Sequence, residues 1–193
     1  MNMKNCRNII LAAAVLVAAS SCSDKVQIKG TIAEAPDTQV VVKQLNGGAL
    51  VALDTVKTDG KGAYSYSVEV LKGQPQFIYL YKGDTKVASL LLRKGDKVKV
   101  ASDTLGKYSV EGSAESELLR QVEEDFAAFL DKFTADAARG DNAAASKDYI
   151  DYYRGRVKFI MENAKSLTAI PVLYQKINDN FPVFSQATDA IMF

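Results

Sequence analysis

Residues 59–70 read DGKGAYSYSVEV, a tight turn followed by a run in which apolar and polar side chains alternate. The turn is Asp59-Gly60-Lys61-Gly62, whose glycines accept the positive backbone angles that hairpin turns require. In the run, two tyrosines and two valines fall on one face, whereas two serines and Glu69 fall on the other. This period of two predicts a strand that buries one face and follows a hairpin turn.

The same alternation extends on both sides of the hairpin, from Val26 to Val110. Short alternating runs separated by turn residues predict eight strands. They cover residues 26–32, 39–45, 50–58, 63–70, 76–81, 87–92, 97–101 and 108–110. Many short strands with turn signals between them are typical of an antiparallel β-sandwich.

The hydrophobic period becomes helical after Gly112, and Ser113 is a suitable N-cap for a first helix. The predicted apolar stripe of this helix comprises Leu118, Val122, Phe126, Phe129, Leu130 and Phe133. A second helix is predicted over residues 144–164, forming an antiparallel hairpin with the first, and a third from Thr168 to residues 178–180. The predicted fold class is α+β, with a β-sandwich domain over residues 22–112 and a helical hairpin or bundle over 113–193.

The first 22 residues have the order of a bacterial lipoprotein signal. Lys4 and Arg7 form a positive start, an apolar stretch follows from Ile9 to Val17, and small residues precede Cys22. We therefore expect a signal peptide over residues 1–21 and a lipid on Cys22 that anchors the chain at the periplasmic face or the outer membrane. An ordinary signal peptide with a cysteine near its cleavage site is the alternative. A membrane-spanning anchor is disfavoured because spanning requires about 20 apolar residues.

Composition argues against several classes of function. The sequence has 24 Lys and Arg residues, 23 Asp and Glu residues, no histidine and two cysteines, Cys6 and Cys22. Balanced charge does not favour a nucleic-acid partner, and the missing residue types remove histidine-based triads, histidine-based zinc sites and Cys-x-x-Cys redox pairs. The acidic run Glu123-Glu124-Asp125 is expected to be a solvated helix face, because consecutive helical positions diverge. We expect no catalytic residue, metal or cofactor in this chain.

Four tyrosines are the remaining candidates for a binding site. Tyr64, Tyr66, Tyr79 and Tyr81 alternate on two predicted strands. They could form a stacking platform for a sugar or a peptide. Alternatively, they pack in the sandwich core with their hydroxyls at its rim, as tyrosines in sheets commonly do.

Several segments resemble a known family. These segments are residues 53–56, 59–66, 92–98 and 108–113 in the sandwich, and residues 163–167, 172–175, 182–184 and 188–189 in the helical part. They are similar to the N-terminal domain of unknown function (DUF4369) of bacterial thioredoxin-like lipoproteins. In that family a thioredoxin-like domain of the alkyl hydroperoxide reductase and thiol-specific antioxidant type follows and carries the redox cysteines.

The resemblance implies an envelope lipoprotein with a non-catalytic accessory module. The expected partners are the membrane, through the lipid on Cys22, and a thioredoxin-like domain or other redox partner. The alternative is a lipoprotein that captures a glycan or peptide through the tyrosine-bearing sheet, and a purely structural envelope protein is a third reading. The apolar end, residues 190–193, suggests either a chain cut short of a partner segment or a buried terminus, and both remain open.

Overall fold

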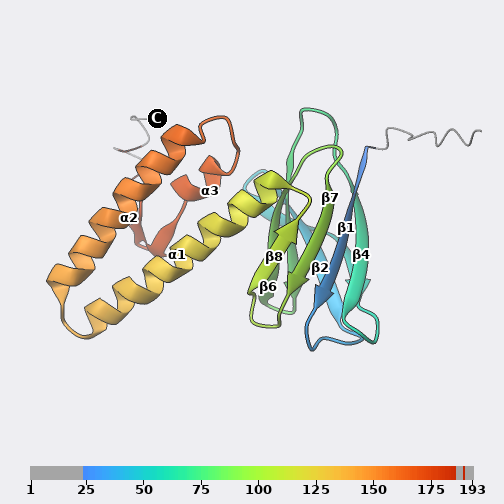
Figure 1. Cartoon of the computed structure of the whole chain (residues 1–193), viewed down its shortest axis with the longest axis horizontal. Coiled ribbons are helices and arrows are strands. Elements are labelled where there is room, and N and C mark those ends of the chain that lie inside the picture. The colour runs from blue at the N-terminus through green and yellow to red at the C-terminus, as the bar shows by residue number, and fades with distance from the viewer. Residues whose placement is uncertain (1–23, 186–188, 190–193) are drawn as a thin grey trace, which may run out of the picture.

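The computed structural model describes residues 24–185 and residue 189, in which strands come first and helices follow (Figure 1). The strands are β1 (Lys25–Ile32), β2 (Gln39–Asn46), β3 (Ala49–Lys57), β4 (Ala63–Glu69), β5 (Gln76–Lys82), β6 (Thr85–Leu92), β7 (Lys97–Ser102) and β8 (Tyr108–Glu111). The later elements are α1 (Ala114–Ala138), α2 (Asn142–Glu162), α3 (Ala169–Leu173), β9 (Lys176–Asn178) and β10 (Phe181–Pro182). The predicted α+β class, a sandwich followed by a helical segment, is confirmed.

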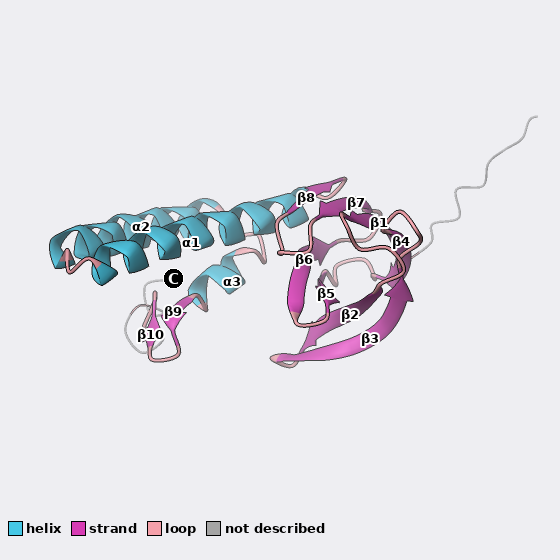
Figure 2. Cartoon of the chain, turned by 90° about the horizontal axis from the view of Figure 1, so that it is seen from below, coloured by secondary structure: helices cyan, strands magenta, loops and turns pink. Residues whose placement is uncertain are grey.

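The first eight strands form two four-stranded sheets that face each other (Figure 2). One sheet has the order β4-β1-β7-β8 and the other β3-β2-β5-β6. The described strand pairs are antiparallel with one exception, since β1 and β7 run parallel from Gln27 opposite Lys97 to Ile32 opposite Ser102. This parallel pair arises because the chain crosses between the sheets after β6, so that β7 starts at the same end as β1.

The alternating residues fill the space between the sheets, as the sequence predicts. In β1, Val26, Ile28 and Ile32 are completely buried. Gly30 occupies the remaining inward position, and the ring of Tyr64 on β4 lies against it. Burying side chains of this size stabilises the fold by about 1.5–3 kcal/mol each, so the sandwich core is a main source of stability.

Helix α1 contacts two partners along its length. Near its start, the buried Leu119 packs with Phe77 and Leu91 of the sandwich. Further along, Val122 belongs to the core of the helical part, and the ring of Phe129 stacks on Tyr152 of α2 with centroids 4.1 Å apart. The predicted helical hairpin of α1 and α2 is confirmed. The predicted apolar stripe of α1 is wrong at Leu118, its first residue. The start of α1 lies on β6, and this contact buries Leu119 instead.

Ser116 joins α1 to the edge of a sheet. Strand β6 is an outer strand, so its backbone groups on one side have no neighbouring strand. The Ser116 hydroxyl accepts a hydrogen bond from the Leu91 N–H at 3.1 Å and donates one to the Leu91 carbonyl at 3.1 Å. Both residues are completely buried, so this hydroxyl satisfies polar groups that water does not reach.

The predicted third helix is too long. Helix α3 ends at Leu173, and a short hairpin of β9 and β10 occupies the residues up to 182. The cause is Gln175, whose carbonyl accepts the Val183 N–H at 2.9 Å and whose side-chain oxygen accepts the Tyr152 hydroxyl at 2.8 Å. These tertiary hydrogen bonds hold the chain extended where the local pattern favoured a helix.

Two predicted features lie outside the described residues: the signal peptide over 1–21 and the apolar end over 190–193. Among the residues that are described, no helix combines the length and the hydrophobicity that crossing a membrane would demand.

Candidate functional site

The predicted lipid attachment residue, Cys22, also lies outside the described residues, but the chain is held from Asp24 onward. The Asp24 carbonyl accepts a hydrogen bond from the Val70 N–H at 2.6 Å, and its carboxylate forms an ion pair with Lys94. Both partners belong to loops at the end of the sandwich where β1 begins. The predicted attachment residue precedes this fixed residue by two positions in the sequence.

The four candidate tyrosines do not come together. Tyr64 and Tyr66 lie on β4 in one sheet, whereas Tyr79 and Tyr81 lie on β5 in the other. Tyr64 is only 6% exposed, its hydroxyl makes no hydrogen bond within the described residues, and burial raises its pKa. Tyr66 is partly buried and packs against the same core. The β4 tyrosines therefore fill the interior of the sandwich.

The β5 tyrosines lie outside the sandwich core, and Tyr79 faces helix α1. Tyr79 packs against Phe77, Leu91 and Leu119, and burial, with a smaller contribution from the Glu123 charge, raises its pKa to about 12. Tyr81 lies beneath the Lys43 ammonium group, 4.1 Å from the ring centroid. Tyr79 therefore belongs to the junction between the sandwich and α1, whereas Tyr81 lies against Lys43 of β2, and both rings are only partly accessible.

A polar cluster lies at the same junction, centred on Glu123 of α1. Its carboxylate accepts hydrogen bonds from Lys86 Nζ at 2.6 Å, Ser89 Oγ at 2.7 Å and the Tyr108 hydroxyl at 2.9 Å. Burial and, secondarily, the Glu123 charge raise the pKa of Tyr108, which therefore stays a hydrogen-bond donor at neutral pH. Three donors on one half-buried carboxylate fix the direction in which α1 leaves the sandwich.

This cluster corrects the prediction for the acidic run. Glu124 and Asp125 are exposed, as predicted for a solvated helix face, but Glu123 is half-buried and bound to the sandwich. The sequence feature that could have indicated this contact is in β6 rather than in α1. Ser89 interrupts an otherwise apolar run in that strand, and a buried hydroxyl needs a hydrogen-bond partner. No grouping of three or more metal-ligating acidic, cysteine or histidine side chains occurs in the described part of the chain.

A groove of about 900 Å³ lies on the outer face of the sheet that contains β1. Small residues at exposed or partly buried strand positions form its floor, and lysines stand at its rim. These residues are Thr31, Ala63, Ser65, Ala101 and Ser109 on the floor and Lys29, Lys57 and Lys99 at the rim. Tyr64 borders the groove, but its burial leaves little of the ring for a ligand. The lining also includes Asp59 and Glu111, and Lys57 and Lys99 form ion pairs with Asp37 and Glu111, so the groove combines hydroxyl groups with charges of both signs.

Comparison with known proteins supports the family resemblance. Residues 26–119 match the model of a domain of unknown function, DUF4369. No curated protein matched the chain. The matched segment starts in β1, contains the other seven strands of the sandwich and ends within α1. The match to the DUF4369 model therefore covers the sandwich of this chain and little more than the first turn of α1.

Proposed function

We propose that this protein is an envelope lipoprotein that a lipid on Cys22 holds at a membrane. The observation that carries the proposal is the order of the first 22 residues: a basic start, an apolar stretch, small residues and then cysteine. A diacylglyceryl group provides a strong anchor because each buried methylene contributes about 0.8 kcal/mol. The short distance along the chain from Cys22 to the fixed Asp24 supports a domain held directly at the membrane.

We further propose that the sandwich and the helical hairpin form a non-catalytic accessory module for a thiol–disulfide oxidoreductase. The DUF4369 match supports this role, because the sequence resembles thioredoxin-like lipoproteins in which such a domain precedes the redox domain. The two cysteines, at positions 6 and 22, do not form a Cys-x-x-Cys pair. The module would then position the redox partner or its substrate near the membrane.

Mass spectrometry of the protein isolated from membranes tests the anchor. We expect the amino terminus to be Cys22 carrying a diacylglyceryl group. Replacing Cys22 with serine should abolish acylation and release the protein from the membrane, whereas Cys6→Ser, within the leader, should leave both unchanged. An unmodified Cys22 thiol in the native protein would refute the anchor.

A redox assay tests the accessory role. The purified chain should not reduce insulin disulfides with dithiothreitol as electron donor beyond the rate with the Cys22→Ser variant. Turnover by this chain without an added partner would show that it is itself an oxidoreductase.

A further inference from the structure

One end of the sandwich must lie close to whatever Cys22 is attached to. Asp24 is fixed at the end formed by the loops 70–75 and 93–96. Two peptide units separate Cys22 from Asp24, and a fully extended chain of that length spans no more than about 7 Å. A lipid on Cys22 would therefore hold this end, which we call the tethered end, against the membrane surface.

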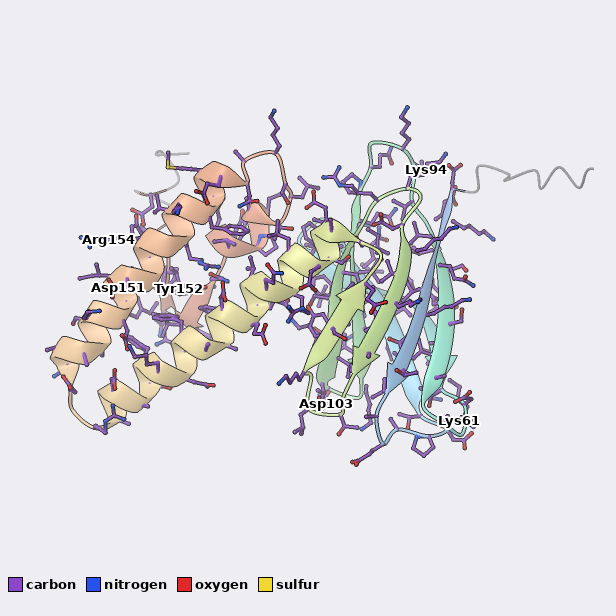
Figure 3. The ribbon with its side chains drawn as sticks, viewed as in Figure 1. Lys61, Lys94, Asp103, Asp151, Tyr152 and Arg154 are labelled. Atoms are coloured by element: carbon purple, nitrogen blue, oxygen red, sulfur yellow. The ribbon has the colours of Figure 1, made fainter. Side chains whose placement is uncertain are left out.

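The two ends of the sandwich differ in charge. The segments at the tethered end carry three basic residues, Lys72, Arg93 and Lys94, and two acidic ones, Asp24 and Asp96. The loops of the far end lie at residues 33–38, 58–62, 83–84 and 103–107. They carry five acidic residues, Glu34, Asp37, Asp59, Asp84 and Asp103, and two basic ones, Lys61 and Lys107. Figure 3 shows Lys94 at the end where β1 begins, with Lys61 and Asp103 at the opposite end.

The tethered end also exposes an apolar side chain next to a basic one. Leu71 is 40% exposed, and Lys72 follows it in a loop that projects beyond β4. A leucine beside a lysine suits the boundary between headgroups and acyl chains, because the methyl groups leave water while the ammonium group stays near lipid phosphates. Arg93 and Lys94 already form ion pairs with Glu115 and Asp24, so Lys72 is the residue on which the test depends.

We propose that the tethered end rests on a bilayer containing anionic lipids, with Leu71 and Lys72 in contact with the headgroups. This inference rests on the proposed lipid anchor and adds an orientation to it. The acidic far end points away from the membrane, since anionic lipids would repel it. The outer groove, whose floor includes Thr31 and Ala101 near the far ends of β1 and β7, stays open to the surrounding solution.

Hydrogen–deuterium exchange on vesicles tests this orientation. The chain from Cys22 to Phe193, which keeps every residue that the structure describes, is coupled through Cys22 to a maleimide-bearing lipid in vesicles of phosphatidylcholine and phosphatidylglycerol. We expect exchange in the loops 70–75 and 93–96 to slow by about fivefold relative to free protein, as one lysine contact with an anionic surface allows. Exchange in the loop 103–107 should not change. Equal protection of both ends, or of neither, would overturn the proposal.

A pair of charge reversals provides the matched control. Lys72→Glu should remove most of the protection at the tethered end, whereas Lys61→Glu at the far end should leave it intact. Equal behaviour of the two variants would also overturn the proposal. Because the lipid is attached chemically, this test stays separate from the mass spectrometry of the native protein: an unacylated native Cys22 refutes the anchor, and an unprotected tethered end refutes the orientation.

Discussion

Ser116 should be worth more to the stability of this protein than an ordinary helical serine. In Ser116→Ala, the buried Leu91 N–H loses its acceptor, and an unsatisfied buried donor costs about 1–3 kcal/mol. The Leu91 carbonyl keeps the Ser113 hydroxyl at 3.3 Å, so it adds little to the loss. Alanine regains about 0.5 kcal/mol through its higher helix propensity. The free energy of unfolding should therefore fall by about 1.5 kcal/mol.

Urea denaturation followed by circular dichroism and tyrosine fluorescence measures this loss. With a typical slope of about 2 kcal/mol per molar urea, the midpoint should fall by about 0.7 M. Ser146→Ala is the matched control, because Ser146 is exposed on α2 and its replacement should be neutral or slightly stabilising. If Ser116→Ala lowers stability by less than about 0.5 kcal/mol relative to Ser146→Ala, the hydroxyl does not satisfy the edge of β6 as argued.

Three further perturbations test other parts of the fold. In urea denaturation, Leu119→Ala should lower the free energy of unfolding by about 3 kcal/mol, clearly more than Leu118→Ala, because only the former opens a cavity at the junction. Equal losses in the two variants would contradict the burial of Leu119 against the sandwich. Gly30→Ala places a Cβ 2.1 Å from the ring of Tyr64, so it should lower the free energy of unfolding by about 1–3 kcal/mol. If the ring moves toward solvent, a spectrophotometric titration should show a lower pKa for the Tyr64 hydroxyl, whereas an unchanged titration would show that the ring does not move. Burial raises the pKa of Tyr79 and Tyr152 to about 12, above the unfolded value near 10. Their contribution to stability is therefore complete below pH 10 and declines between pH 10 and 12, and flat urea midpoints across that interval would argue against it.

The strands were predictable because each obeys a local rule. The hairpin at residues 59–70 and the alternation in β1, β4 and β7 fix which side chains are buried, and the observed strands agree with the prediction within a few residues. The change to a helical period after Gly112 likewise located the start of α1. Hydrophobic periodicity shows whether a segment buries one of its faces, and this property can be read from residues that are close together in the sequence.

The features that escaped prediction all depend on contacts between distant segments. The parallel pairing of β1 with β7, the burial of Leu119 and the binding of Glu123 each require the sandwich and α1 to be placed together first. The same holds for Gln175, whose two hydrogen bonds override a local preference for helix. The tyrosines show this most clearly, since identical alternation on β4 and β5 places the β4 pair inside the sandwich but Tyr79 against a helix and Tyr81 against Lys43. Periodicity cannot tell which element will cover a given face.

The segment that matches DUF4369 is shorter than the segment that the sandwich needs to fold, and the difference lies in helix α1. The DUF4369 match stops at Leu119, little more than one turn into a helix that continues to Ala138. A protein cut at that boundary would keep Leu119 but lose Glu123, the residue that binds three side chains of the sandwich. Anyone producing the sandwich by itself should therefore extend it to the end of α1.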